Sequence, residues 1–269
     1  MEKQKTQQQK KVAIVGYGYV GTAYHKVFPD AVIYDPFKGY NDKEAVNNCD
    51  LAIVCVPTQM KEDKSADISI VEEVVGWLET PLILIKSTVP PTTTQKLRES
   101  THKRICHSPE YVGEGGYYIP YWKYAHPTEP QHHSFVIVGG EPKDRDEIID
   151  IFQRVLGADK IYFQCTSTAS ELIKYFENCT IGSRVTLSNV FAKICESFGE
   201  SYNQVREGLV LDERLGKMFT SVFKDKRGFG GKCIPKDMNA IVQASKKNGY
   251  DPKLLQSILD VNDELKTNQ

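Results

Sequence analysis

Residues 11–21 of the chain are KVAIVGYGYVG, and they indicate the fold of its first half. The first part of this stretch, KVAIVG, is a short run rich in β-branched residues, which is typical of a buried parallel strand. The following GYGYVG fits G-x-G-x-x-G and opens a helical stretch, and Asp35 ends the next strand about 20 residues after Gly16. This combination predicts a dinucleotide-binding βαβ unit.

The glycine turn indicates how a dinucleotide would be held. Gly16 permits a tight turn, and Gly18 lets the backbone approach a pyrophosphate at the helix N-terminus. Asp35 can bond ribose hydroxyls and would repel a 2′-phosphate, which favours NAD over NADP. A glycine turn without a ligand is the alternative. The expected cofactor contacts here are Gly16, Tyr17, Gly18, Tyr19, Val20, Gly21, Asp35 and Lys38.

The chain continues as strands that alternate with helical patterns, such as those at 68–79 and 144–156. Alternation of this kind predicts an α/β fold with right-handed crossovers, here a Rossmann-type doubly wound, mainly parallel sheet. The further strands are expected at 31–35, 51–56, 82–86, 135–140 and 160–163.

The pattern changes near residue 166. Thr168 and Glu171 form a predicted capping box, and one helix of about 30 residues should follow and end at Gly199. A helix this long should connect to a second domain or form a partner interface. The later residues look all-helical, and Asp251-Pro252 starts the last helix. The expected domains are a loose leader at 1–10, an NAD-binding domain at 11–166 and a helical dimerisation domain at 167–269.

Bulk properties exclude several classes of function. The net charge of the 269 residues is −1, so no nucleic-acid-binding face is indicated. The N-terminus has no apolar signal region, and no apolar run reaches membrane-spanning length. Seven cysteines, an odd number without a CxxC pair, suit a reducing cytoplasm and argue against structural zinc. We therefore expect a cytoplasmic protein without a metal.

One cysteine stands apart, in the stretch GFGGKCIPKD at 228–237. Pro235 fits the first position of a helix, so Cys233 should lie just outside a helix N-terminus, between Lys232 and Lys236. Both the helix end and the lysines favour a thiolate. The preceding glycines leave room for a substrate. A nucleophile and a structural cysteine both remain open on these residues alone.

Other candidate residues are weaker when each is taken alone. Lys174 and Asn178 share a helix face at i and i+4. KSTVPPTTT at 86–94 places polar side chains at a strand end, where ligands sit in such sheets. SPEYVGEG at 108–115 presents two glutamates in a glycine-containing loop. A solvated helix face or loop explains each of them equally well.

Together, these stretches resemble the UDP-glucose dehydrogenase family of NAD-dependent nucleotide-sugar dehydrogenases. The matching pieces are GYGYVG, CVPT, KSTVPP, SPEYVGEG, ELIKYFEN, LDERLG and GFGGKCIPKD. The resemblance implies oxidation of a sugar C6 alcohol to a carboxylate in two NAD-dependent steps, through a thiohemiacetal and a thioester on Cys233. UDP-glucose is the family's commonest substrate. The long helix matches the family's dimer helix.

The resemblance also implies roles for individual residues, with Arg214 reaching the sugar nucleotide of a neighbouring subunit. The implied catalytic residues are Cys233, Lys174, Asn178, Asp237, Thr88 and Glu110. The further implied cofactor contacts are Pro57, Thr58, Ser87, Thr88, Glu114 and Lys236. The implied substrate contacts are Glu110, Tyr111, Val112, Lys174, Asn178, Arg214, Phe229 and Gly230.

The sequence departs from the family at its C-terminal end. Family members normally carry a third, C-terminal domain that helps to bind the nucleotide, and this sequence ends at Gln269. An aromatic segment at 117–133 is a candidate for stacking on a base or covering the cleft, with an ordinary loop as the alternative. Two other functions stay open: a hydroxyacid dehydrogenase of the 6-phosphogluconate type, and a non-catalytic protein that binds NAD or a nucleotide sugar.

Overall fold

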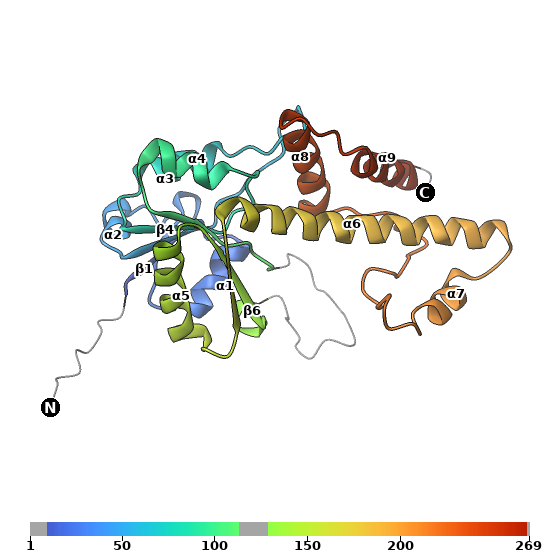
Figure 1. Ribbon diagram of the computed structural model, residues 1–269, viewed down its shortest axis with the longest axis horizontal. Helices are drawn as coiled ribbons and strands as arrows, with labels where there is room; N and C mark the ends of the chain where they lie inside the picture. The colour runs from blue at the N-terminus through green and yellow to red at the C-terminus, as the bar shows by residue number, and fades with distance from the viewer. Residues whose placement is uncertain (1–9, 113–128, 268–269) are drawn as a thin grey trace. The chain divides into compact units, whose positions relative to one another are not determined.

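The computed structural model describes residues 10–112 and 129–267 (Figure 1). The chain divides into two compact units. The first unit comprises residues 1–59 and 67–174, and the second comprises residues 60–66 and 175–269. The division falls inside one long helix rather than before it, and a short segment after the CVPT motif belongs to the second unit.

The first unit contains a twisted sheet whose seven described strands follow the order β2-β1-β3-β4-β5-β6-β7. All neighbouring strands are parallel except β5 and β6. This confirms the predicted Rossmann-type, mainly parallel sheet. The strands are β1 (Val12–Val15), β2 (Val32–Tyr34), β3 (Leu51–Val54), β4 (Leu82–Ile85), β5 (Ile105–His107), β6 (Phe135–Gly139) and β7 (Ile161–Cys165).

Helices cover both faces of this sheet, which explains why its central strands are continuously apolar. One face packs against α2 (Lys43–Asn47), α3 (Ser69–Trp77) and α4 (Thr93–Thr101). The opposite face packs against α1 (Tyr19–Val27) and α5 (Pro142–Leu156). The described part of this unit also contains two short 3₁₀ helices, η1 (Pro36–Lys38) and η2 (Pro130–His132).

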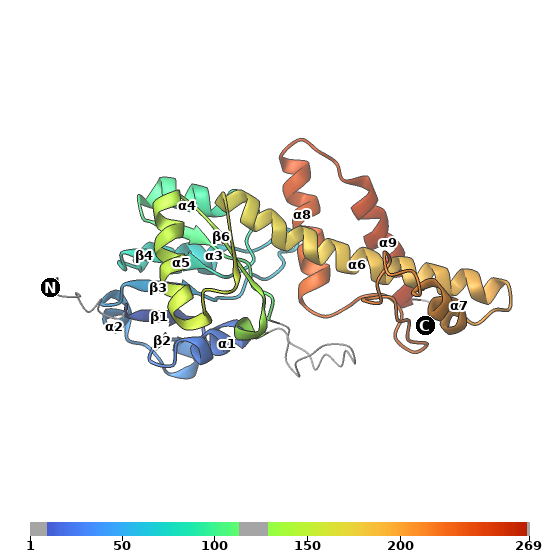
Figure 2. The same cartoon turned by 60° about the horizontal axis from the view of Figure 1, so that its bottom comes forward.

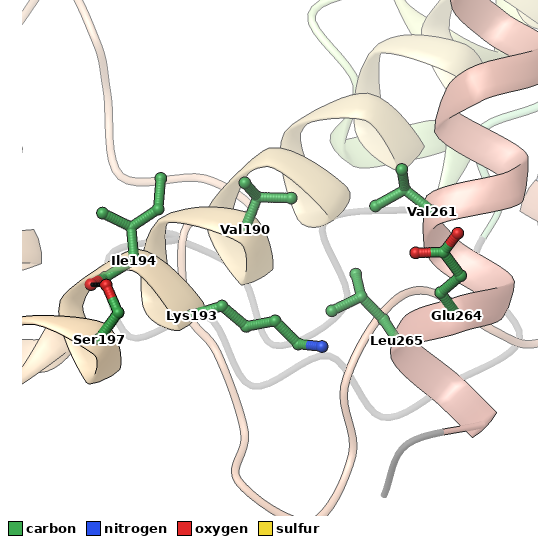
Figure 3. Close-up of a pocket in the computed structure, with 7 residues that line it drawn as sticks. All are labelled: Val190, Lys193, Ile194, Ser197, Val261, Glu264 and Leu265. Atoms are coloured by element: carbon green, nitrogen blue, oxygen red, sulfur yellow. Dashed lines mark hydrogen bonds between the residues drawn. The ribbon is translucent and has the colours of Figure 1, made fainter.

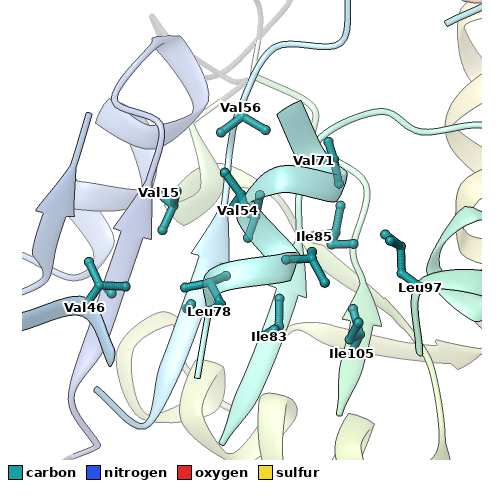
Figure 4. Packing of buried hydrophobic residues seen from close by; sticks show 14 of the residues in the cluster. Val15, Val46, Val54, Val56, Val71, Leu78, Ile83, Ile85, Leu97 and Ile105 are labelled. Atoms are coloured by element: carbon teal, nitrogen blue, oxygen red, sulfur yellow. The ribbon is translucent and has the colours of Figure 1, made fainter. Parts of the chain in front are cut away.

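Burial of the strand side chains supplies the stability of the first face. Val54 and Ile85 from the sheet pack against Val71 of α3 and Leu97 of α4 (Figure 4). Fully burying one such side chain stabilises the fold by roughly 1.5–3 kcal/mol. The carboxyl ends of the strands are thereby held in fixed positions.

The order of the strands reverses at β1. The chain passes from β1 to β2 on one side and then to β3 on the other side of β1. Ligands of doubly wound sheets bind at this kind of reversal, outside the carboxyl ends of the strands. The segments that follow β1 and β3 are the glycine turn and CVPT, so the topology brings both motifs to the point where the strand order reverses.

Strand β5 was not predicted. It has only three residues, Ile105–His107, between charged and polar neighbours, so its apolar run is too short to be recognised. It nevertheless lies fully buried between β4 and β6 and pairs antiparallel with β6. Its carboxyl end leads directly into the SPEY motif.

The second unit is mainly helical. It contains most of α6 (Ser167–Ser197), together with α7 (Tyr202–Leu209), α8 (Cys233–Lys247) and α9 (Lys253–Thr267). Figure 2 shows α8 and α9 as neighbouring helices. The long helix is confirmed and is followed by Gly199 at φ +74°. The expectation of an all-helical C-terminal part is wrong for 210–232, which has turns and one isolated bridge.

The predicted capping box at the start of α6 is also wrong. Thr166 accepts the hydrogen bond from the Ala169 N–H at 3.2 Å. Glu171 is fully buried and instead accepts hydrogen bonds from the N–H groups of Thr92 and Thr94 at 2.7 and 2.8 Å, at the N-terminus of α4. Burial raises the pKa of Glu171 to about 7, and the bonds from Thr94 and Thr92 act against that rise. Glu171 thus ties two helix starts together.

In the described part of the chain, no helix combines the length and the apolar composition that crossing a bilayer requires.

Candidate active site

The glycine turn after β1 has the geometry that its sequence predicted. Gly16 adopts φ +92°, and a Cβ placed on it would lie 2.7 Å from the carbonyl oxygen of Cys55. A Cβ on Gly21 would lie 2.0 Å from the carbonyl oxygen of Gly16. A Cβ on Gly18, by contrast, would meet nothing within 4 Å. Two glycines are therefore required by close backbone packing, and the middle one faces open space.

The residues around this turn fit a dinucleotide. Gly18 is the N-cap of α1, and among the described residues no side chain caps this helix start and no acidic residue stands in its first turn. Such a helix N-terminus attracts a pyrophosphate. The Asp35 carboxylate accepts hydrogen bonds from the N–H groups of Tyr17 at 2.9 Å and Phe37 at 3.1 Å. Each carboxylate oxygen has a second lone pair that can accept a ribose hydroxyl.

Other side chains brace the same turn. Lys38 Nζ donates to the carbonyl oxygen of Tyr17 at 2.5 Å and lies 5.3 Å from the centre of the Tyr17 ring. The Tyr17 hydroxyl is 2.7 Å from Nδ1 of His25. Tyr19 is more than half exposed. Tyr17 and Lys38, both predicted cofactor contacts, therefore lie close together, and Lys38 stabilises the turn through its bond to the Tyr17 carbonyl oxygen.

The CVPT and KSTVPP motifs meet at the carboxyl ends of β3 and β4. Thr58 Oγ1 donates to the carbonyl oxygen of Thr88 at 2.8 Å. Ser87 Oγ donates to the carbonyl oxygen of Val56 at 2.7 Å. Pro57 is exposed and the Thr88 side chain is half-buried, whereas Thr58 and Ser87 are buried. Thr58 and Ser87 therefore join the two segments, because the side-chain hydroxyl of each bonds a backbone carbonyl oxygen of the other segment.

A lysine and a glutamate come together at the end of the first unit. Lys174 Nζ lies 3.8 Å from Glu110 Oε1 and 5.0 Å from the centre of the Tyr111 ring. Glu110 Oε2 accepts a hydrogen bond from the Val112 N–H at 2.7 Å. Lys174 is only 7% exposed. Four predicted residues thus form one cluster that pairs an ammonium with a carboxylate.

Lys86 supports this cluster, although sequence reasoning gave it no role. It is 1% exposed, and its Nζ donates to Ser108 Oγ and to the carbonyl oxygen of Pro109, both at 2.9 Å. Its Nζ also lies 4.7 Å from the centre of the Tyr24 ring. Burial lowers the pKa of Lys86 to about 7. A lysine directly after the apolar run LILI was the signal that could have found it.

In the second unit, Cys233 is exposed, whereas the other six cysteines are buried or half-buried. Helix α8 begins at Cys233 itself, with Lys232 as N-cap, so the predicted start at Pro235 is two residues late. Proline is accommodated at the third position because the first N–H groups of a helix have no intrahelical partner. The thiol therefore stands in the first turn of the helix rather than just before it.

Asp237 is 1% exposed and lies one turn into α8. It accepts a hydrogen bond from Asn178 Nδ2 at 2.6 Å and forms an ion pair with Lys236. Cys179, beside Asn178, is buried, and burial with a further contribution from Asp237 raises the pKa of its thiol to about 12. Three predicted residues are thus joined, and the neighbouring thiol is held protonated.

The glycine-rich turn before Cys233 is only partly open. Gly230 and Gly231 have no atom within 4 Å of an added Cβ, as predicted. Gly228 is packed instead, because its added Cβ would lie 2.6 Å from Asn262 Oδ1. The Phe229 side chain is 4% exposed. Room for a substrate therefore exists at two of the three glycines.

The remaining predicted residues are not joined to these clusters. The Arg214 side chain is 88% exposed and bonds both carboxylate oxygens of Asp212, at 2.9 and 2.6 Å. Glu114 and most of the aromatic segment 117–133 lie outside the described residues. Within the described ranges, no group of three or more His, Cys, Asp or Glu side chains could hold a metal ion.

A separate cavity of about 310 Å³ lies between α6 and α9 and includes no predicted site residue (Figure 3). Its lining residues are Val190, Lys193, Ile194, Ser197, Val261, Glu264 and Leu265.

The fold and the glycine turn define a dinucleotide-binding domain followed by a helical domain. Two sequence models of one family match the chain. Residues 30–150 match the NAD binding domain of the UDP-glucose/GDP-mannose dehydrogenase family, and residues 168–264 match its central domain. The chain belongs to this family, and its first domain is an NAD-binding domain.

Individual relatives agree with this assignment. UDP-glucose 6-dehydrogenase AglM of Haloferax volcanii is 27% identical in an alignment of 311 positions, gaps included, which covers 94% of this chain and 69% of that protein. The chain spans about half the length of several other curated relatives, 52% in one and 49% in another.

Solved structures show the same fold. A UDP-glucose dehydrogenase from Pyrobaculum islandicum superposes with a TM-score of 0.78 at 20% identity, over 97% of this chain and 69% of that one. A 3-hydroxyisobutyrate dehydrogenase from Mycobacterium tuberculosis superposes with a TM-score of 0.67 at 15% identity, over 95% and 93% of the two chains. The fold alone therefore does not separate sugar-nucleotide from hydroxyacid dehydrogenases.

Proposed function

We propose that this protein oxidises the C6 alcohol of a nucleotide sugar to the carboxylate, with two NAD consumed per sugar and Cys233 as the covalent nucleophile. The observation that carries the proposal is that the one exposed thiol among the seven cysteines stands in the first turn of α8. A helix N-terminus stabilises a thiolate, which is the nucleophilic form. UDP-glucose is the favoured substrate because the named relatives act on it.

Bound NAD would accept one hydride from C6 in each of the two oxidations. The Cys233 thiolate adds to the C6 aldehyde, and the new C–S bond gives a thiohemiacetal. After the second oxidation this carbon is a thioester. Water then adds to the thioester, the C–S bond breaks and the thiolate leaves, so that one water is consumed for each carboxylate formed.

The buried polar groups supply charge stabilisation for these steps. We propose that the Lys174 ammonium and the Asn178 amide, one turn apart on α6, oppose the oxyanion that develops at C6. Asp237 holds the Asn178 amide in place through the bond at 2.6 Å. Glu110, already 3.8 Å from Lys174 Nζ, acts with Thr88 on the hydrolytic water and in proton transfer.

A homodimer through α6 belongs to the same proposal. Leu187, Phe191, Ile194 and Phe198 follow a helical stripe in the second unit, and each is more than a third exposed. Aromatic and aliphatic side chains at this spacing are typical of a helix–helix interface. The exposed Arg214 would then be available to a neighbouring subunit's substrate. We place the protein in the cytoplasm, in the supply of uronic acids for polysaccharides.

The test is a panel of nucleotide sugars, UDP-glucose, UDP-N-acetylmannosamine and GDP-mannose, each incubated with NAD while NADH and sugar acid are measured. Wild type should form the acid from at least one sugar. Cys233→Ala should form none, whereas the matched control Cys165→Ala, at a half-buried thiol of the first unit, should remain active. Acid formation by Cys233→Ala, or activity only on small hydroxy acids, would contradict the proposal.

A further inference from the structure

The turn that leads to Cys233 has little stiffness of its own. Three of the four residues Gly228–Gly231 are glycines, and glycine has more conformational freedom to lose on folding than any other residue. A thiol carried by an unsupported glycine turn would sample many positions. A reactive group needs a defined position, because misplacement by about 1 Å can reduce a rate on the order of a hundredfold.

One side chain from a distant part of the sequence holds this turn. Asn262 lies on α9 and is 2% exposed. Its Oδ1 accepts a hydrogen bond from the N–H of Phe229 at 2.6 Å, and its Nδ2 donates to the carbonyl oxygen of Phe229 at 3.2 Å. A single amide thus bonds both backbone groups of one turn residue, which fixes the position and the orientation of that peptide segment.

The neighbouring residues are fitted to this contact. Gly228 adopts φ +73°, and an added Cβ would lie 2.6 Å from Asn262 Oδ1, so any larger residue there would displace the amide. On the other side, the Phe229 ring lies against α6, where an added Cβ on Gly182 would be 3.4 Å from Phe229 Cε1 and 3.0 Å from Ile234 Cγ2. The backbone bonds of Asn262 and the packing at Gly182 therefore restrain the turn together.

The position of Asn262 within α9 supports the same interpretation. It lies between Leu259 and Leu265 on the buried face of α9, where an apolar residue would be expected. A buried amide is unfavourable there unless its hydrogen bonds are satisfied. Its two bonds to Phe229 satisfy that requirement, and they act on the turn that ends at Cys233.

We infer that Asn262 is a positioning residue for Cys233, which clamps the Gly228–Gly231 turn and thereby sets where the thiol stands in the first turn of α8. This inference rests on the proposed role of Cys233 as the nucleophile. Asn262 itself touches no reacting atom in this scheme.

The experiment compares Asn262→Ala with Leu259→Ala, a truncation one turn earlier on α9 that removes a buried side chain without hydrogen bonds. Alkylation of Cys233 by iodoacetamide is followed by mass spectrometry across a pH series, and kcat and KM are measured on the nucleotide sugar that the wild type accepts. Chemical denaturation shows how much each truncation weakens the fold.

We expect Asn262→Ala to change the Cys233 alkylation rate several-fold and to shift its pH profile. We also expect kcat to fall about 10- to 100-fold with less than a threefold change in KM. Leu259→Ala should weaken the fold while leaving the alkylation profile as in the wild type. The inference would be overturned if the alkylation profile of Asn262→Ala were the same as that of Leu259→Ala and of the wild type.

Gly228→Ala provides a second route if Asn262→Ala does not fold, because its Cβ displaces the same amide from Phe229. It should change Cys233 alkylation in the same way, and an unchanged profile would count against the clamp. A wild-type protein that oxidises no nucleotide sugar, but whose Cys233 alkylation still depends on Asn262, would reject the proposed function and retain the clamp.

Discussion

Replacing Lys86 with methionine is expected to remove a pH-dependent penalty on folding. Burial lowers the pKa of Lys86 to about 7, with the neighbouring Cys55 and Glu110 acting to raise it and Lys174 to lower it further. An unfolded lysine has a pKa of about 10.4. Between these two values the unfolded chain binds more protons than the folded one, so stability should rise with pH.

The size of the effect follows from the shift. Lowering the pKa of Lys86 from its ordinary value of 10.5 to about 7, at about 1.4 kcal/mol per pH unit, corresponds to a penalty of order 5 kcal/mol that is fully present below the folded pKa. It disappears as the pH rises to the unfolded value. Between about pH 7 and about pH 9, the wild type should therefore gain about 2 kcal/mol from this group alone.

The assay is chemical denaturation of wild type and Lys86→Met at several pH values, with Lys143→Met on the exposed face of α5 as the matched control. Groups that do not interact with Lys86 titrate equally in all three proteins, so only the difference between proteins is interpreted. The wild type and the control should gain stability with pH relative to Lys86→Met. Parallel curves for wild type and Lys86→Met would refute the assignment of a buried, readily deprotonated lysine.

Three further perturbations test the packing and the cofactor site. Gly182→Ala gains about 1 kcal/mol of helix propensity, but its Cβ would lie 2.5 Å from Met238 Sδ, and overpacking costs about 1–3 kcal/mol. Denaturation should therefore show it to be up to about 2 kcal/mol less stable, while Gly208→Ala on α7, where an added Cβ meets nothing within 4 Å, should not be destabilised. Glu171→Ala leaves two N–H donors unpaired and should lose about 2–4 kcal/mol, whereas equal stability would show that those bonds are not formed. Asp35→Asn should weaken NAD binding in calorimetry and reduce the preference over NADP, and an unchanged preference would remove Asp35 from the ribose site.

The parts of the fold that the sequence predicted are those with strong local signals. The apolar runs at β1, β3 and β4 are fully buried, so their composition alone indicates strands. The glycine turn was predictable because GYGYVG follows an apolar strand and opens a helix, and Gly16 adopts the positive φ that a tight turn requires. The close approach at Gly21 is visible only in the structure. Helix α6 was predictable from its length without proline.

One error arose because a partner distant in the sequence decides the outcome, and another because a helix start is poorly defined by one local signal. Glu171 stands three residues after Thr168, which fits a capping box, yet its carboxylate bonds α4 instead. Local spacing cannot distinguish these partners. Pro235 marked a plausible helix start, but α8 begins at Cys233 because the first turn needs no N–H from that position.

Part of the candidate site was predictable as a set of residues but not as contacts. The link between Asn178 and Asp237 joins positions far apart in the chain and is visible only in the structure. Lys86 and Asn262 were missed because a lysine after a strand and an asparagine in a charged helix both look solvated. The position of each residue could have revealed its burial. Lys86 directly follows a buried apolar strand, and Asn262 lies between the buried Leu259 and Leu265 on one face of α9.

The covalent double oxidation at Cys233 is tested by the ratio of NADH formed to sugar carboxylate formed in a single reaction run to completion. Covalent retention of the aldehyde on Cys233 predicts two NADH for each carboxylate, without free aldehyde, and a thioester on the Cys233 peptide when the reaction is quenched early. One NADH per turnover with free aldehyde as the product would contradict the covalent double oxidation.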